Sequence, residues 1–433
     1  MRKKIKLLFT NLMYLNHNYG AQGIALPLMD KLNKYFDAEY TFVIPERYFE
    51  NDISFARKYG FNIIAEPMSS LFLERGFWGT HILYPAFTYL RYKRLKKIGE
   101  EQKKLYFYLI EKLKECDAVI DLSGIEFVGN ISFKGKWASY IQTILMHRLA
   151  KKFNKPYIKY TKSYGPFQGI VYRTLIRREL NSLPFVFVRG ESNLEEVKTL
   201  NLNVPTFSFP DISIVLEPAP KSWAVEYISS LGMNPSISIA GISPSAVISK
   251  IKKVDESSSC GSNHISLCKK LINFFQSRDQ QVLLIPHSLD QKNPSACDLE
   301  LSKKIYSNLE DFKNVFIVSD ALNYKEVRAI IRLLDFYVTS RYHSVSSALS
   351  MGIPVVSLSW HIKYQDIMSL FLDDFLVIDC RTTGVEEALS LIEKYYTNRS
   401  WFNREKVLEK KEEIVKQIDK SIEILVEELE KYV

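Results

Sequence analysis

Residues 335–360 read DFYVTSRYHSVSSALSMGIPVVSLSW. The pattern predicts a short buried strand, a helix of small residues and a second strand, at residues 336–338, 344–350 and 355–358. Together these elements form the parallel strand–helix–strand crossover of an α/β fold. Ligands of such folds bind at the carboxyl ends of the strands. Arg341 and His343 fall in the turn that leaves the first strand, so we expect them at a binding site.

Arg341 and His343 have side chains suited to binding and to proton transfer. A guanidinium offers a planar fork of donors to phosphate or carboxylate. A histidine two residues later can exchange a proton near neutral pH. The competing interpretation is structural, with Arg341 at a strand end and His343 bonded to backbone. The pair alone leaves both interpretations open.

Similar strand-and-turn patterns occur along the whole chain. A strand at residues 5–10 is followed by a loop with Asn18 and Gly20 and then by a helix at residues 24–36. In a loop between the first strand and the first helix, phosphate or sugar often binds to the N–H groups of the helix N-terminus. The loop lacks the full Gly-x-Gly-x-x-Gly pattern of a dinucleotide site. Other predicted strands are followed by residues that are polar or glycine, namely Gly124, Ser163, Gly165, Arg189, Ser192 and His287.

These elements, in this order, resemble the polysaccharide pyruvyl transferase family. Its C-terminal signature of Arg-Leu-His, Gly-x-Pro and a later Lys is matched by Arg341-Tyr342-His343, Gly352-Ile353-Pro354 and Lys363. Shorter matches are Asn18-Tyr19-Gly20, Ser163-x-Gly165-Pro166-Phe167, Arg189 with Ser192, Pro210-Asp211 and Pro286-His287. Asp290 and Asp298 are both candidates for the acid that follows the last of these. The chain departs from the family pattern at Ala21, Ile125 and Tyr342.

The resemblance implies a GT-B-like architecture, in which two Rossmann-like α/β domains face each other across a cleft. A proline-rich stretch at residues 205–222 separates two runs of alternating strands and helices. We therefore expect an N-terminal domain at residues 1–210 on the acceptor side and a C-terminal domain at residues 211–433 on the donor side. The second domain ends in a charged amphipathic helix at residues 404–433 that braces the structure.

The resemblance also implies an activity, because the family transfers the pyruvyl unit of phosphoenolpyruvate to two hydroxyls of a sugar and forms a cyclic ketal. His343 and Arg341 are then the expected catalytic residues. The expected donor-binding residues are Arg189, Ser192, Tyr342, Lys363 and His287. For His287, a structural role at a strand end is the competing interpretation. The expected acceptor or loop residues are Asn18, Gly20, Gly124, Ser163 and Gly165.

The composition fits a two-domain cytoplasmic protein. The chain has 433 residues, a formal charge of +9 and five scattered cysteines, which argues against a disulfide framework. The apolar run after the first lysines is too short for a signal peptide. The positive charge favours anionic partners. We expect phosphoenolpyruvate as the donor and a sugar or lipid-linked oligosaccharide as the acceptor, and we expect no binding to nucleic acid. Cys260, His264 and Cys268 have helical spacing without a fourth ligand, so we expect no metal and no cofactor.

Residues 66–115 combine aromatic and basic side chains. We interpret them as a helical insertion on the surface of the first domain. The alternative is docking on an anionic membrane face or on a lipid-linked acceptor, which would make the protein peripheral at the inner membrane.

Two other functions fit the same pattern. A nucleotide-sugar-dependent glycosyltransferase uses the same GT-B-like scaffold, and a catalytically dead glycan-binding module is consistent with the three departures. The sequence does not identify the acceptor sugar, the ketal stereochemistry or the oligomeric state.

Overall fold

The computed structural model describes residues 2–66, 100–128, 133–250, 259–290 and 292–433. The chain divides into two compact units. The first unit comprises Met1–Asn16, Leu28–Asp211 and Lys420–Val433, and the second comprises His17–Pro27 and Ile212–Asp419. The continuous helices α1 (Tyr19–Leu32) and α16 (Arg404–Leu429) therefore contribute residues to both units.

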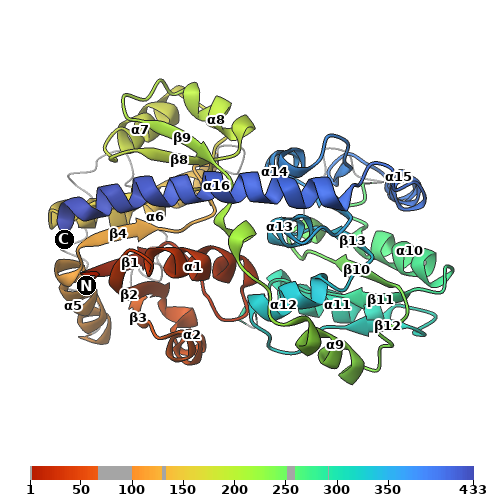
Figure 1. The fold of residues 1–433 in the computed structure, drawn as a ribbon. Helices are drawn as coiled ribbons and strands as arrows, with labels where there is room; N and C mark the ends of the chain where they lie inside the picture. Colours follow the sequence, from red (N-terminus) through yellow and green to blue (C-terminus); the bar gives the residue numbers. More distant parts are fainter. Residues whose placement is uncertain (1, 67–99, 129–132, 251–258, 291) are drawn as a thin grey trace. The chain divides into compact units, whose positions relative to one another are not determined.

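The first unit contains a five-stranded parallel sheet (Figure 1). In spatial order its strands are β3 (Asn62–Glu66), β2 (Phe36–Pro45), β1 (Lys3–Thr10), β4 (Ala118–Asp121) and β6 (Tyr157–Lys159). Runs of buried apolar residues such as Leu7–Phe9 make these strands the core of the unit, as expected for a sheet covered on both faces. The strand order reverses between β1 and β4.

Helices and two small parallel ladders complete the first unit. The described helices are α2 (Glu46–Tyr59), α5 (Glu100–Glu115), α6 (Phe133–Lys152), α7 (Ile170–Leu180) and α8 (Glu191–Lys198). The ladders pair β5 (Ile125–Glu126) with β7 (Ser163–Tyr164), and β8 (Val186–Arg189) with β9 (Thr206–Phe209).

The second unit contains a six-stranded parallel sheet. Its spatial order is β12 (Val315–Ile317), β11 (Gln281–Leu284), β10 (Ile239–Ser243), β13 (Phe336–Thr339), β14 (Val355–Ser359) and β15 (Val377–Asp379). One face packs on α10 (His264–Gln276), α11 (Asp298–Ser307) and α15 (Val385–Thr397). The remaining helices are α9 (Lys221–Ser230), α12 (Tyr324–Ile331), α13 (Tyr342–Ser350) and α14 (Lys363–Phe371). Because the order reverses between β10 and β13, the unit is a doubly wound α/β fold.

The stretch at residues 335–360 folds as its pattern predicts, with one difference. The strand, helix and strand are β13, α13 and β14. The helix begins at Tyr342, with Arg341 extended at its N-cap position (φ −119°, ψ 128°), two residues before the predicted start. His343 therefore lies in the first helical turn and not in the preceding loop, because the backbone N–H groups of residues 344 and 345 already bond to Arg341 O.

The observed units differ in two segments from a division at residue 210. The segment His17–Pro27, expected in the N-terminal domain, belongs to the second unit, because it bonds to the loop after β11: the Tyr19 N–H donates to the His287 carbonyl, and the Leu289 N–H donates to the His17 carbonyl. The C-terminal residues from Lys420 onward belong to the first unit. Tyr160 and Ser421 hydroxyls bond at 2.9 Å there.

Part of the predicted insertion at residues 66–115 lies outside the described residues, which resume with α5. None of the helices in the described ranges is long and apolar enough to cross a membrane. All five cysteines are buried, and none forms a disulfide.

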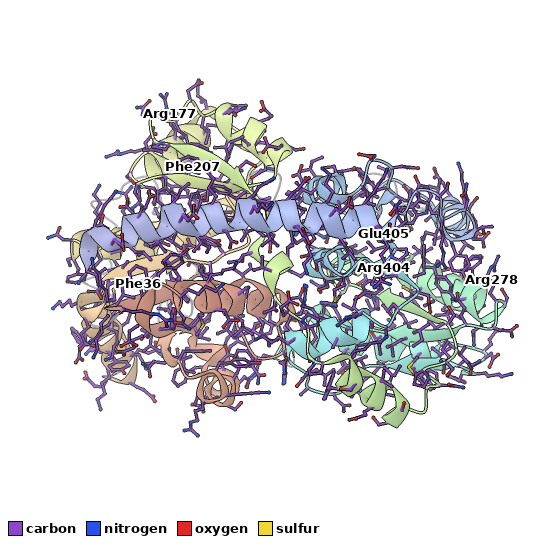
Figure 2. The ribbon with its side chains drawn as sticks, in the orientation of Figure 1. Phe36, Arg177, Phe207, Arg278, Arg404 and Glu405 are labelled. Atoms are coloured by element: carbon purple, nitrogen blue, oxygen red, sulfur yellow. The ribbon has the colours of Figure 1, made fainter. Side chains whose placement is uncertain are left out.

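We predict that Gly352→Ala destabilises the protein more than Gly60→Ala. Both positions have left-handed backbone (φ 69° and 71°), so an alanine at either should lower the free energy of unfolding by about 1 kcal/mol. A Cβ at Gly352 would also lie 2.8 Å from Cγ of Arg404, the first residue of α16 labelled in Figure 2, whereas nothing lies within 4 Å at Gly60. The Gly352 variant should lose about 1 kcal/mol more. Urea unfolding measures both, and equal losses would contradict the contact with α16.

Candidate functional site

The candidate site of the second unit lies where its strand order reverses. The residues that follow β10, β11 and β13 come together at the carboxyl edge of the sheet, where ligands of doubly wound folds bind. Arg341 and His287 follow two of these strands. His343 follows on the first turn of α13, so the structure brings three of the predicted residues to one edge.

Asp298 fixes the direction of the Arg341 guanidinium. Arg341 Nε and Nη2 donate to the two carboxylate oxygens, with Nε at 2.8 Å. The same carboxylate accepts backbone N–H bonds from Ala246, His287 and Ser288. Asp298 is fully buried, whereas the Arg341 side chain is 23% exposed. Of the two candidate aspartates, Asp298 is thus the one that pairs with Arg341, whereas the Asp290 carboxylate accepts the N–H groups of residues 292 and 293 in its own loop.

His287 is a buried histidine with an unsatisfied ring nitrogen. Its Nε2 lies 3.5 Å from the Tyr337 hydroxyl, and its Nδ1 has no hydrogen-bond partner among the described residues. Burial, with the charges of Arg341 and His343 nearby, holds the pKa of His287 well below its ordinary value. His287 is therefore neutral at pH 7, suited to hydrogen bonding rather than to supplying a proton.

The loop of Asn18 and Gly20 lies beside His343. A Cβ at Gly20 would lie 2.8 Å from His343 Nδ1, so only glycine allows this approach. Asn18 Oδ1 accepts the N–H of Ala21 at the start of α1, and Asn18 pairs with Ser288 through a backbone bridge. Both residues had been expected in the N-terminal domain, on the acceptor side. Instead they belong to the same unit as Arg341, because their contacts are made after β11 and α13.

Lys363 lies within a group of aromatic rings. Its Nζ is 5.5 Å from the ring centre of Tyr342, 5.1 Å from Trp360 and 5.3 Å from Tyr364, distances typical of cation–π contacts. Tyr342 is buried and its ring contacts the His343 ring edge to face. The tyrosine that departs from the family pattern thus forms part of the packing around both His343 and Lys363.

His264 is a residue of this edge that the sequence reasoning weighed only as a metal ligand. It is buried, with Nε2 3.3 Å from the Ser245 N–H and 3.9 Å from Cys268 Sγ. Burial and the nearby Arg341 charge lower its pKa to about 4. Within the described residues, no three His, Cys, Asp or Glu side chains are placed to hold a metal ion.

In the first unit, Arg189 is held by protein groups on three sides. Its guanidinium donates to Ser163 Oγ at 3.2 Å, to the Gly124 carbonyl at 2.8 Å and to Asp211 at 2.6 Å. The side chain is only 4% exposed. The structure thus brings Arg189, Gly124 and Ser163 together, and it adds Asp211 as the anionic partner of Arg189.

Two other predicted residues of the first unit have different surroundings. Ser192 is exposed on the first turn of α8, whereas its neighbour Asn193 is buried and bonds to both backbone groups of Tyr164. Gly165 has left-handed backbone (φ 78°), and its N–H donates to the Glu126 carbonyl. Gly165 therefore shapes the turn after β7.

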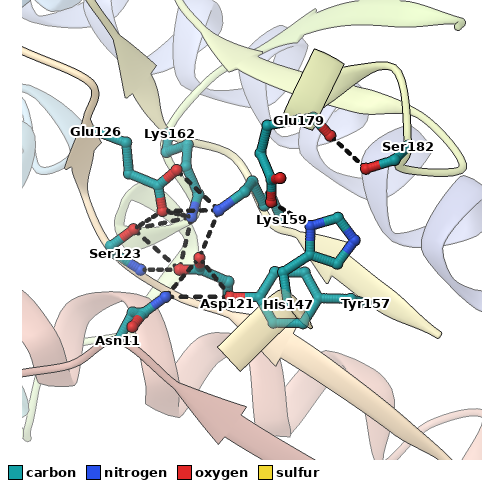
Figure 3. A network of polar contacts seen from close by, with 10 residues as sticks. All are labelled: Asn11, Asp121, Ser123, Glu126, His147, Tyr157, Lys159, Lys162, Glu179 and Ser182. Carbon is teal, nitrogen blue, oxygen red and sulfur yellow. Dashed lines mark hydrogen bonds and ion pairs between the residues drawn. The ribbon is translucent and has the colours of Figure 1, made fainter. Parts of the chain in front are cut away.

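A buried cluster of charges lies at the carboxyl ends of β4 and β6 (Figure 3). Lys159 and Lys162 point toward Asp121 and Glu126, with Nζ to carboxylate distances between 2.6 and 2.9 Å. Burial disfavours the charged form of Asp121, but the two ammonium groups hold its pKa well below its ordinary value. Lys162 Nζ also donates to Ser123 Oγ at 2.8 Å.

This cluster fixes the turn that contains Gly124, whose carbonyl accepts a hydrogen bond from Arg189. Sequence reasoning missed the cluster because a lysine in a strand pattern normally indicates an exposed face. The only available signal was a pair of lysines, Lys159 and Lys162, beside the predicted turn at Ser163.

Comparisons with known proteins identify the class and then the family. Solved UDP-GlcNAc 2-epimerases are similar over nearly the whole chain, and the two parallel α/β units are those of the GT-B fold. The enzyme from Rickettsia bellii has a TM-score of 0.55 and 12% identity, covering 100% of this chain and 98% of its own. The enzyme from Neisseria meningitidis, bound to UDP-GlcNAc, has a TM-score of 0.55 and 10% identity over 99% and 100% of the two chains.

The family model described as polysaccharide pyruvyl transferase matches residues 18–362. The chain therefore belongs to the polysaccharide pyruvyl transferase family. No curated protein matches the chain. The solved structures, at these identities, show the fold alone.

We predict that Asp298→Asn destabilises the protein by about 2 kcal/mol. The change keeps the side-chain shape but leaves Arg341 without its anionic partner, and removing one member of a buried ion pair is costly. Glu300→Gln is the matched control, because Glu300 lies on the same helix in an exposed pair with Lys303 and should lose less than about 0.5 kcal/mol. Urea unfolding measures both variants. Equal losses would show that the Asp298 carboxylate is not needed as an anion.

We predict a pH-dependent loss of stability from His264. Its pKa is about 4 in the folded protein and near 6.5 when unfolded, so the unfolded chain binds the proton first as pH falls. From pH 7 to pH 5 the free energy of unfolding should fall by about 2 kcal/mol on account of this residue. His264→Gln removes this contribution, so the stability gap between the two proteins should narrow by that amount. A gap that stays constant over this range would contradict a neutral, buried His264.

Proposed function

We propose that this protein transfers the pyruvyl group of phosphoenolpyruvate to two hydroxyls of a sugar in a bacterial surface-polysaccharide precursor. The observation that carries the proposal is the meeting of Arg341, His343 and His287 at the carboxyl edge of the second sheet, in a chain that belongs to the polysaccharide pyruvyl transferase family.

The charges at this edge suit a small, highly anionic donor. Arg341 is oriented by Asp298, and a guanidinium fixed in this way binds a phosphate or carboxylate through paired hydrogen bonds. Lys363, on the first turn of α14, adds a second positive charge. The unsatisfied Nδ1 of buried His287 offers a further hydrogen bond to a ligand oxygen. The expected contact of Arg189 with the donor stays a prediction.

His343 is the proposed proton donor. Its carbonyl and ring sit at the start of α13, while His287 is held neutral, so the two histidines divide hydrogen bonding and proton transfer between them. The His343 imidazolium gives its proton to the methylene carbon of phosphoenolpyruvate as the first sugar hydroxyl bonds to C2. The second hydroxyl then bonds to C2 and phosphate leaves.

The protons and bonds of this scheme balance. The new methyl group receives the proton of His343, the proton of the first hydroxyl restores the imidazolium, and the proton of the second hydroxyl leaves with the phosphate. Two C–O bonds to the sugar form, and the C–O bond to phosphate breaks. All groups come from side chains and substrates, so we propose that no cofactor takes part.

The acceptor is proposed to be a sugar or a lipid-linked oligosaccharide in the cytoplasm. A peripheral position at the inner membrane would follow if residues 66–115 bind anionic lipid, but residues 67–99 lie outside the described ranges.

We expect His343→Ala to fold normally and to lose activity. The residue is half-buried at a helix start, so the change should leave the unfolding temperature nearly unaltered, while loss of a proton donor typically costs about 10²- to 10⁴-fold in rate. The measurement is phosphate release from phosphoenolpyruvate with a panel of sugar and lipid-linked sugar acceptors, with the ketal product identified by mass. Lys198→Ala, an exposed residue of α8, is the control.

Two outcomes would overturn the proposal. An active His343→Ala variant would end the catalytic role of this histidine. A thermal shift with UDP or UDP-GlcNAc, and none with phosphoenolpyruvate, would favour a nucleotide-sugar glycosyltransferase, as the enzyme of the same fold bound to UDP-GlcNAc suggests.

A further inference from the structure

Tyr324 is a buried residue on which several separate segments of the second unit meet. It is the first residue of α12 and is 0% exposed. It contacts the segment of residues 19–23, the loop after β11 and helix α13. The proposed reaction gives it no direct part, and a tyrosine hydroxyl is normally placed in a protein interior only where it has a defined hydrogen-bonding role.

The Tyr324 hydroxyl holds the start of α13. It donates to the carbonyl of His343 at 2.8 Å and lies 2.7 Å from Ser347 Oγ. These two residues are one helical turn apart. A single hydroxyl therefore fixes the backbone of His343 relative to the rest of α13.

Arg328 anchors this contact from the same helix. Its guanidinium is 1% exposed and donates to Ser347 Oγ at 3.2 Å, Ser350 Oγ at 2.8 Å and the Ser213 carbonyl at 3.2 Å. In the described part of the chain, no carboxylate forms an ion pair with it. A buried charge bonded only to neutral oxygens is costly, and here it binds the C-terminal turn of α13, where the helix dipole favours a cation.

The Tyr324 ring holds the segment that borders the His343 imidazole. It lies parallel to the Tyr19 ring, with centres 6.3 Å apart, and a Cβ at Gly23 would lie 2.6 Å from its Cε1. The Tyr324 N–H donates to Gln22 Oε1 at 2.8 Å. The same segment presents Gly20 to His343 Nδ1. The position of that glycine against the imidazole thus depends on how Tyr324 packs.

We propose that Tyr324 is a positioning residue that sets the orientation of the His343 imidazole. Its hydroxyl bonds to the His343 backbone, and its ring packs against residues 19–23, which border the imidazole. Arg328 holds α13 in place through hydrogen bonds to Ser347 and Ser350. It does not touch the substrate. This inference rests on the proposed function, because it assigns a supporting residue to the proposed proton donor.

Tyr324→Phe tests the proposal, because it keeps the ring packing and removes only the hydroxyl. We expect kcat for phosphate release from phosphoenolpyruvate to fall by about tenfold or more, since small misplacements of a reacting group have large effects on rate. KM for phosphoenolpyruvate should stay within about twofold, because no donor contact is lost. Tyr227→Phe is the matched control: it removes the hydroxyl of a half-buried tyrosine of α9, which donates to Asp320 at 2.9 Å in an exposed hydrogen bond, and it should leave both constants unchanged.

A second readout does not depend on turnover. In protein labelled with ¹⁵N-histidine, with the His343 ring signals assigned from a His343→Gln variant, Tyr324→Phe should shift those signals and Tyr227→Phe should not. If the wild-type protein releases no phosphate from phosphoenolpyruvate, the proposed function fails, while the histidine spectra still decide whether Tyr324 positions the ring. Unmoved His343 signals together with an unchanged kcat would overturn the inference, as would a rise in KM without a fall in kcat.

Ser347→Ala covers the case in which Tyr324→Phe does not fold. It removes the hydroxyl that lies between Tyr324 and Arg328 and deletes one oxygen only. The same fall in kcat and the same shift of the His343 signals are expected. If a folded Ser347→Ala protein shows neither change, the proposal that Tyr324 positions His343 is overturned.

Discussion

The paired hydrogen bonds between Arg341 and the buried carboxylate of Asp298 are the interaction on which the candidate site depends. Asp298 also accepts backbone N–H groups from the loops after β10 and β11, so one carboxylate joins three strand ends at the point where the sheet order reverses. A buried carboxylate is stable only when its oxygens are satisfied in this way. The position of the guanidinium is therefore set by the closure of the loops around it.

The first unit also contains an arginine that is held by a buried aspartate. Arg189 is paired with Asp211 and also bonds to Ser163 and the Gly124 carbonyl. Both arginines lie at the carboxyl end of a strand, and both are held by an aspartate. They differ in exposure, since the side chain of Arg189 is 4% exposed and that of Arg341 is 23% exposed. A ligand therefore reaches the guanidinium of Arg341 with less rearrangement than it needs to reach that of Arg189.

Hydrogen bonds of serine hydroxyl groups fix the position of helix α13 in the second unit. The small residues of its sequence predict close packing, but the structure shows that its serines also act as hydrogen-bond partners. Ser346 bonds to Ser213, Ser347 to Tyr324, and Ser350 to Arg328. Composition indicates the size of these side chains, whereas their partners come from α12 and from residues more than one hundred positions earlier in the chain. Prediction from the helix alone could not find them.

The sequence by itself determined the strand–helix–strand unit around Arg341 and His343, because a short apolar run, a small-residue helix and a Gly-x-Pro turn are local signals. It also determined the family, through short motifs in a fixed order. Only the tertiary structure decided that Asp298 and not Asp290 orients Arg341, that Gly20 borders His343, and that Lys159 and Lys162 are buried. The physical reason is that burial and charge pairing depend on which distant segments pack together. Tyr324 and Gln22, for example, bond across 302 positions of the chain.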